Sequence, residues 1–158
     1  MSMHVRFLPF HGCGYRTRLI YYLMSRRGKS IPETAGAGVL IVEDEAEIRN
    51  LFAMLLEAEH YTVFQAEEGE AALDLLREQG DRIAVMITDL GLPRMGGVEL
   101  ISRAKNIQPG VRIVGTSGFG RENVRELVLA AGADEFISKP FNINAVLAKV
   151  RQLSTRVP

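Results

Sequence analysis

The sequence predicts an α/β fold in which five βα units build one parallel sheet with helices on both of its faces. Two short apolar runs, VLIV at residues 39–42 and IAVMIT at residues 83–88, lack the alternation of a half-exposed strand. Such runs are typical of parallel strands that are covered on both faces. Segments with helical spacing separate these runs from three further strand candidates, and this strict alternation indicates right-handed crossovers within one sheet.

The expected elements follow one another regularly along the chain. The strands are expected at residues 39–42, 61–66, 83–88, 111–117 and 134–139. The first four helices are marked by apolar residues three or four positions apart, namely Ile48, Leu51, Phe52, Leu55 and Leu56; Ala71, Ala72, Leu75 and Leu76; Val98, Leu100, Ile101 and Ala104; and Val124, Leu127, Val128 and Ala131. A fifth helix is expected from Ile143 to Leu153. We expect the flavodoxin-like (βα)5 arrangement, a doubly wound sheet with strand order 2-1-3-4-5.

Composition limits the function classes that are open to the chain. Its 158 residues are 47% hydrophobic, which is enough for one ordinary globular core. Lys+Arg and Asp+Glu each total 19, so the basic excess that direct nucleic-acid binding usually requires is absent. Cys13 is the only cysteine, which excludes an intrachain disulfide and favours a reducing, cytoplasmic location.

The first 36 residues differ from the rest in charge. They hold six basic residues and one acidic residue, which leaves a net charge of about −5 on residues 37–158. The apolar run LIYYLM at residues 19–24 is too short for a membrane span, which needs about 20 residues, and no signal-peptide cleavage pattern follows it. We therefore predict a basic leader or linker over residues 1–36, which is disordered, left over from cloning or translated from a wrongly assigned start, with membrane-surface binding as the alternative. The folded domain is expected over residues 37–158.

Polar residues gather at the carboxyl ends of the predicted strands. In open parallel sheets, ligands bind outside these ends, where the strand order reverses. The residues at these ends are Glu43 and Asp44 after the first strand, Asp89 after the third, Thr116 and Ser117 in the fourth and Lys139 in the fifth. Three carboxylates at one edge repel one another unless a hard cation such as Mg²⁺ neutralises them. This placement predicts a metal-assisted phosphoryl site.

Each of these residues has a simpler interpretation when it is taken alone. Asp44 with Glu47 three residues later matches a capping box that begins a helix. Ser117 before Gly118 is typical of a turn, and Asp89 is also a candidate cap for the following loop. A lysine at a strand end is usually solvated. Only the joint placement favours the phosphoryl site.

The order and spacing of the polar residues resemble those of a known family. Asp89 follows Asp44 by 45 residues, Ser117 follows Asp89 by 28, and Lys139 follows Ser117 by 22. The motifs VLIVEDE, ITDLGLPRMGGVEL, GTSGF and AGADEFISKPF accompany this spacing. Together they resemble the receiver domain of two-component response regulators over residues 38–153.

The resemblance implies a phosphoryl acceptor and a metal site. Asp89 would accept the phosphoryl group, and Lys139 would pair with the phosphoryl oxygens. Mg²⁺, or Mn²⁺ in its place, would be held by Glu43, Asp44, Asp89 and the backbone carbonyl of Gly91. Glu43 stands where the family often has an aspartate, a change that the family tolerates.

The resemblance also implies a switch. Ser117 would hydrogen-bond the phosphoryl oxygens, and Phe136 would reorient on activation. Thr116 competes with Ser117 for this role, but Ser117 is preferred because Gly118 follows it and its spacing to the lysine fits. The peptide bond before Pro140 resembles the cis bond of the family, although a plain strand-ending proline is the simpler interpretation.

A signalling switch, rather than an enzyme that turns over a separate substrate, is therefore expected. It would take a phosphoryl group from a sensor histidine kinase or a histidine phosphotransfer protein and change the surface that it offers to a downstream protein. We expect a monomer or weak dimer without direct nucleic-acid binding. Only 18 residues follow Pro140, so no output domain is expected.

Three alternatives remain open from the sequence. The chain could be the receiver part of a hybrid histidine kinase. It could be a phosphohydrolase with an aspartate nucleophile, although no cap or second motif acid is evident. A flavodoxin-like cofactor binder is the weakest alternative, because no Ser/Thr-rich phosphate loop follows the first strand.

Overall fold

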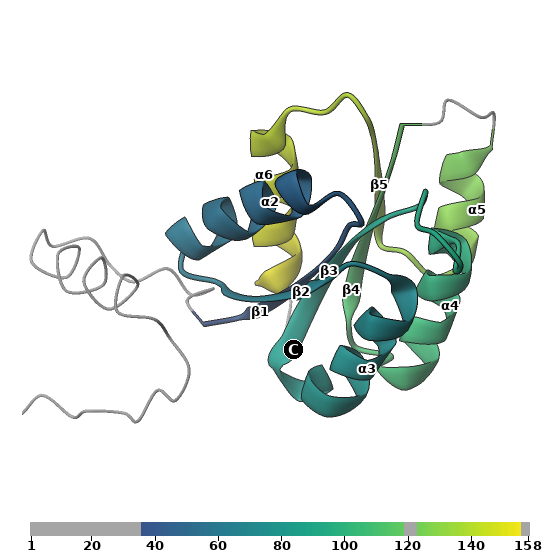
Figure 1. Cartoon of the computed structure of the whole chain (residues 1–158), viewed down its shortest axis with the longest axis horizontal. Helices are drawn as coiled ribbons and strands as arrows, with labels where there is room; N and C mark the ends of the chain where they lie inside the picture. Colours follow the sequence, from purple (N-terminus) through teal and green to yellow (C-terminus); the bar gives the residue numbers. More distant parts are fainter. Residues whose placement is uncertain (1–35, 119–122, 156–158) are drawn as a thin grey trace, which may run out of the picture. The chain divides into compact units, whose positions relative to one another are not determined.

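A computed structural model of the chain describes residues 36–118 and 123–155, in which strands and helices alternate (Figure 1). The strands are β1 (Gly38–Val42), β2 (Thr62–Ala66), β3 (Ile83–Asp89), β4 (Arg112–Ser117) and β5 (Glu135–Ser138). The helices are α2 (Ala46–Ala58), α3 (Gly69–Gln79), α4 (Gly97–Ile107), α5 (Val124–Ala130) and α6 (Ile143–Ser154), with a short 3₁₀ helix, η1 (Gly80–Arg82), before β3. The leader predicted over residues 1–36 lies outside the described residues, apart from Gly36.

The five strands form one parallel sheet in the order β2-β1-β3-β4-β5, which confirms the predicted topology. The apolar strands β1 and β3 lie inside the sheet, and β3 is the middle strand. In the register of the sheet, Val42 of β1 lies beside Thr88 of β3, and Asp89 lies beside Thr116 of β4. The strands therefore end together at one edge, where the sequence places the polar residues.

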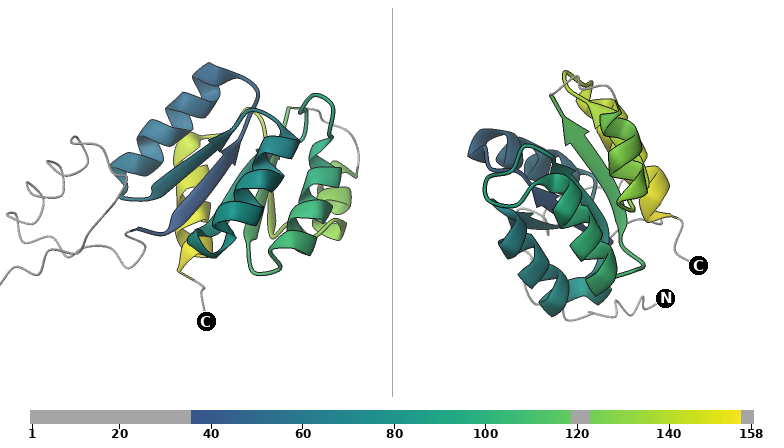
Figure 2. Two further views of the ribbon diagram at one scale, coloured as in Figure 1. Left: turned by 60° about the horizontal axis from the view of Figure 1, so that its bottom comes forward. Right: turned by 90° about the vertical axis from the view of Figure 1, so that its right-hand side faces the viewer.

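Helices cover both faces of the sheet, as Figures 1 and 2 show. Along β1, Val39 and Ile41 pack with residues of α2 and α6, whereas Leu40 and Val42 pack with residues of α3, α4 and α5. Successive strand residues point to opposite faces, so a strand between two helical layers must be apolar at every position. All five residues of β1 are buried for this reason.

The predicted elements agree with the observed ones to within about one residue at most strand ends, the usual uncertainty of element boundaries. β3 extends one residue further than predicted and includes Asp89 as its last residue. Across residues 36–118 and 123–155, no helix combines the length and apolarity needed to cross a membrane.

Candidate functional site

Three carboxylates meet at the carboxyl edge of the sheet. Glu43 and Asp44 directly follow β1, and Asp89 ends β3 beside it. One carboxylate oxygen from each of the three residues lies within 4.8 Å of the other two. Glu43 is buried at 3% exposure, Asp89 is half-buried and Asp44 is exposed. The acidic cluster expected from the strand ends is therefore present.

The turn between β1 and α2 holds two of these acids. The Glu43 N–H donates a hydrogen bond to the Ala66 carbonyl at 3.1 Å, which extends the pairing of β1 with β2. On the other side of the turn, Arg49 Nη1 donates to the Glu43 carbonyl at 2.6 Å and to the Asp44 carbonyl at 3.3 Å. Sequence reasoning missed Arg49. Its only signal was an arginine spaced about one helical turn beyond the acidic pair.

The capping box proposed for Asp44 and Glu47 is wrong. α2 begins at Ala46, its N-cap residue is Glu45, and no side chain makes a capping hydrogen bond there. Asp44 lies one residue before the cap position, so its carboxylate belongs to the strand end rather than to the start of the helix. The simpler interpretation of Asp44 therefore does not compete with a metal-binding role.

Backbone contacts fix the position of Asp89. The N–H of the next residue, Leu90, donates to the Thr116 carbonyl at 2.9 Å, and the Gly97 N–H donates to the Leu90 carbonyl at 3.2 Å. A Cβ atom on Gly97 would lie 2.6 Å from Leu90 Cα and 2.8 Å from the Asp89 carbonyl oxygen, so only glycine fits there. The N-cap of α4 is Gly96 and has no side-chain partner, so Asp89 is not a helix cap.

Lys139, the residue after β5, joins the acidic cluster. Its Nζ lies 3.3 Å from Glu43 Oε2 and 3.3 Å from Asp89 Oδ2, and its side chain is 23% exposed. Its backbone N–H donates to the Ser117 carbonyl at 2.7 Å, and the Lys139–Pro140 bond is cis, as the resemblance implies. The interpretation of Lys139 as a solvated lysine is therefore wrong.

The charges of the cluster influence one another strongly. Burial raises the pKa of Glu43, and the charge of Asp89 adds to this effect, so that the opposing influence of Lys139 is outweighed. Burial alone would lower the pKa of Lys139, but Asp89 and Glu43 together raise it above its usual value. Lys139 is thus held as a cation between two acids.

The donor set suits a hard divalent cation. Three carboxylates face one ammonium group, which leaves negative charge uncompensated at the site. Mg²⁺ prefers carboxylate, carbonyl and water oxygens, and the cluster offers the first of these. Gly91 lies two residues past Asp89 in the exposed loop before α4. The predicted use of its carbonyl as a ligand stays a prediction.

The predicted switch residues lie on neighbouring strands. Ser117 ends β4 and is buried at 2% exposure, one residue beyond the position that pairs with Asp89. Thr116 Oγ1 donates to the Thr88 carbonyl at 3.3 Å, so its hydroxyl already serves the backbone of β3. The choice of Ser117 over Thr116 as the hydroxyl for a phosphoryl group stays a prediction. Phe136, on β5, is half-buried and packs against the core on the side of α3, α4 and α5.

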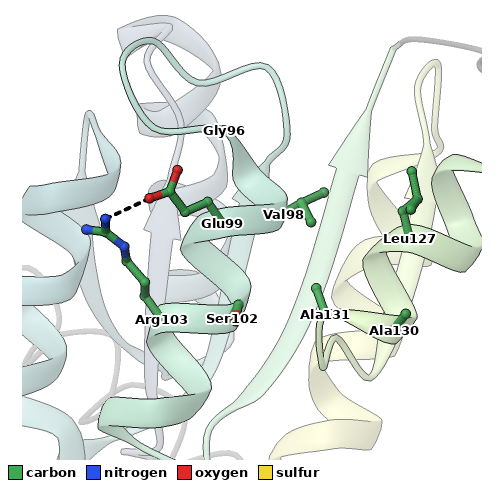
Figure 3. Close-up of a pocket in the computed structure, with 8 residues that line it drawn as sticks. All are labelled: Gly96, Val98, Glu99, Ser102, Arg103, Leu127, Ala130 and Ala131. Atoms are coloured by element: carbon green, nitrogen blue, oxygen red, sulfur yellow. Dashed lines mark ion pairs between the residues drawn. The ribbon is translucent and has the colours of Figure 1, made fainter.

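A shallow groove lies between α4 and α5 (Figure 3). Its lining residues are Gly96, Val98, Glu99, Ser102, Arg103, Leu127, Ala130 and Ala131. Figure 3 shows Glu99 paired with Arg103, at 2.7 Å, on one side and apolar side chains on the other. The three acidic residues of the cluster are not among those that line this groove.

Comparison with known proteins gives one consistent result. A family model for the response regulator receiver domain matches residues 39–151. The transcriptional regulatory protein CpxR of Escherichia coli (strain K12) is 34% identical over 118 residues, which cover 75% of this chain and 49% of CpxR. The chain thus spans about half the length of the curated relatives that it matches.

Solved structures agree with this match. A response regulator receiver domain protein from Clostridium thermocellum has a TM-score of 0.72 and 26% identity, covering 76% of this chain and 95% of its own. A response regulator protein from Burkholderia pseudomallei, solved with a phosphorylated aspartic acid, calcium ion and citrate, has a TM-score of 0.67 and 26% identity. It covers 75% of this chain and 69% of its own.

Proposed function

This chain belongs to the response regulator receiver domain family, and we propose that it is a phosphorylation-dependent signalling switch whose phosphoryl acceptor is Asp89. The observation that carries this proposal is the position of Asp89. It ends the middle strand of the sheet, beside the acidic pair that follows β1, and its Oδ2 lies 3.3 Å from Lys139 Nζ. This placement supports the proposal, because it brings a carboxylate, an ammonium group and two further acids to one point at the edge of the sheet.

The geometry supports Asp89 rather than its neighbours as the nucleophile. Glu43 is buried and its carboxylate is paired with Lys139, so a donor reaches it less readily. Asp44 is exposed at the rim, where a ligand for a hydrated cation is expected. Asp89 is half-buried and central, so a donor can reach it while Glu43 and Asp44 supply the other carboxylates of the metal site.

The transfer needs little chemistry from the protein beyond positioning and positive charge. An Asp89 carboxylate oxygen attacks the phosphorus of a phosphohistidine, the new O–P bond forms, and the N–P bond of the donor breaks. The leaving imidazole takes up a proton. Lys139 neutralises charge on the transferred oxygens, and the Ser117 hydroxyl donates a hydrogen bond to one of them. Mg²⁺, or Mn²⁺, held by Glu43, Asp44, Asp89 and the Gly91 carbonyl, would supply positive charge on the other side.

The product is the signal. An aspartyl phosphate carries roughly two negative charges at pH 7 and three acceptor oxygens, which draw Ser117 and Lys139 toward it. Movement of Ser117 vacates space into which Phe136 turns. Arg125 of α5 donates to the Phe136 carbonyl at 3.2 Å, so a shift of β5 reaches the surface of α5. Hydrogen exchange is expected to change in α5 and β5 more than in α2. A change confined to the residues beside Asp89 would contradict the switch.

We propose a sensor histidine kinase or a histidine phosphotransfer protein as the phosphodonor, and contact with a downstream protein in the cytoplasm as the output. The balanced charge of the chain supports a protein target over direct nucleic-acid binding. A receiver that belongs to a hybrid histidine kinase would have the same chemistry and differ only in what is attached to it.

Incubation with acetyl phosphate and Mg²⁺ separates this proposal from its rivals. A receiver accumulates one phosphoryl group per chain in intact mass spectra. A phosphohydrolase with an aspartate nucleophile releases inorganic phosphate continuously, in large excess over the protein. A cofactor binder shows neither result. Continuous turnover or the absence of an adduct in the wild-type protein would refute the proposed function.

A further inference from the structure

We propose that Arg49 is a positioning residue for the metal site, holding the turn after β1 in the geometry that its two acids need for Mg²⁺. This inference rests on the proposed function, because it concerns the cation that phosphorylation would require. Its evidence is separate, since Arg49 is not one of the metal ligands. Its contacts with the turn are hydrogen bonds to backbone carbonyls.

The turn from β1 to α2 depends on Arg49 for its closure. The Arg49 backbone N–H donates to the Glu45 carbonyl at 3.0 Å, within the first turn of α2. Its side chain then reaches back, and Nη1 donates to the Glu43 carbonyl at 2.6 Å and to the Asp44 carbonyl at 3.3 Å. The carbonyls of all three residues of the turn are therefore bound by one residue.

Within residues 36–118 and 123–155, Arg49 is the only side chain that donates a hydrogen bond to the Glu43 and Asp44 carbonyls. The N-cap residue Glu45 makes no side-chain capping bond. The remaining link inside the turn is a long one, from the Glu45 N–H to Glu43 Oε1 at 3.4 Å, and it engages a carboxylate that the metal would use. Arg49 is half-buried, so its bonds are partly shielded from competing water. The backbone carbonyls of Glu43 and Asp44 are thus held by a side chain outside the cluster, whereas Lys139 contacts the Glu43 carboxylate.

The two possible roles of Arg49, as a nearby charge and as a positioning residue, predict opposite changes in Mg²⁺ affinity when the residue is replaced. A positive guanidinium near an acidic site repels Mg²⁺, so if Arg49 acted only as a charge, its removal would tighten Mg²⁺ binding. If it positions the turn, its removal loosens the ligands and weakens binding. Residues that orient metal ligands typically change affinity by 10- to 100-fold when they are mutated. Whether Mg²⁺ binds more tightly or more weakly after removal of Arg49 therefore distinguishes a role as a charge from a role in positioning.

The test uses the full chain and Mg²⁺ alone, with affinity measured by calorimetry. Arg49→Gln removes the charge and the reach of the side chain, and Arg49→Lys keeps the charge but ends one bond short of Nη1, the atom that donates to both carbonyls. We expect both variants to bind Mg²⁺ about tenfold more weakly than wild type. Arg77→Gln and Arg77→Lys are matched controls on α3, where Arg77 pairs with exposed Asp74, and they should not change the affinity.

A second readout separates positioning from general damage to the fold. With acetyl phosphate as donor, the Arg49 variants should need about tenfold more Mg²⁺ for half-maximal phosphorylation but reach nearly the wild-type level at saturation. Unchanged or tighter Mg²⁺ binding in both variants overturns the inference and leaves the proposed function intact. A wild-type protein that does not bind Mg²⁺ overturns the proposed metal site, and this inference with it.

Discussion

Replacing Lys139 with methionine removes the ammonium group but keeps most of the side-chain stem. In the structure this ammonium lies between Glu43 and Asp89, at 3.3 Å from an oxygen of each. Its loss leaves two adjacent carboxylates, one of them almost fully buried, without a nearby cation. We expect the metal-free variant to be less stable than wild type at neutral pH.

The size of the loss follows from the geometry. At 3.3 Å and an effective dielectric constant of about 20, each contact contributes about 5 kcal/mol of gross attraction. Desolvation of the buried ions cancels several kcal/mol of this sum. Glu43 can also take up a proton, because its pKa is already raised. The free energy of unfolding is therefore expected to fall by about 2 kcal/mol, less than the 3–5 kcal/mol typical of a broken pair that is fully buried.

The same geometry sets the dependence on metal and on pH. Mg²⁺ brings back positive charge, so the difference between variant and wild type should shrink as Mg²⁺ increases. The pKa of Glu43 in the folded protein lies above its unfolded value of 4.5, and removal of Lys139 raises it further. As the pH falls through this raised pKa, Glu43 becomes neutral and no longer needs a cation. The deficit should therefore shrink from pH 7 toward pH 4.5.

Urea unfolding followed by circular dichroism measures these differences. Lys149→Met is the matched control, because Lys149 Nζ lies 2.9 Å from Glu135 Oε2 but its side chain is 32% exposed. The control should lose less than about 1 kcal/mol and show no Mg²⁺ dependence. A Lys139 variant as stable as wild type, or one whose deficit is indifferent to Mg²⁺ and pH, would refute the view that this lysine neutralises the acidic cluster.

Three further outcomes are expected. Asp44→Ala should abolish the stabilisation that Mg²⁺ gives to the wild type in thermal unfolding, and a retained Mg²⁺ response would place the metal elsewhere. Asp134→Asn should cost about 2 kcal/mol at neutral pH. Burial alone would raise the pKa of Asp134, but hydrogen bonds from the Ile113 N–H and two basic side chains lower it. The stability that the charged Asp134 contributes is therefore present above its unfolded pKa of 3.8 and is lost as the pH falls below that value. If the Asp134→Asn variant were still less stable than wild type by the same amount at lower pH, the lost stability would not come from the charge of Asp134. Deleting residues 1–36 should leave the melting temperature within a few degrees, and a loss of about 3 kcal/mol would show that the leader packs on the domain.

Most of the fold could be predicted because its cause is local. The fully apolar runs in β1 and β3 require cover on both faces, and the helical spacing between them supplies the cover, so layers and strand order follow. The acidic cluster could also be predicted, because parallel strands end at one edge. Residues 44 and 89 are far apart in sequence but are brought together by the pairing of β1 with β3.

Other features depend on how side chains reach across turns, which spacing does not reveal. The start of α2 after Glu45 was not predicted, since Asp44 has an equally good capping sequence. The reach of Arg49 back to the turn depends on its rotamer. The loop after Asp89 takes its positive φ, 65°, at Arg94, although glycines follow nearby, and no sequence signal marks an arginine for that conformation.

Phosphorylation of the Asp89→Asn variant, compared with that of the wild type, tests most directly the claim that Asp89 is the phosphoryl acceptor. Asparagine keeps the shape of the side chain but removes the anionic nucleophile. After incubation with acetyl phosphate and Mg²⁺, intact mass spectra should show one phosphoryl group on the wild type and none on the variant, and peptide mapping of the wild type should place the label on Asp89. A variant labelled as fully as the wild type, with the label on Glu43, Asp44 or Ser117, would contradict the assignment of Asp89 as the phosphoryl acceptor.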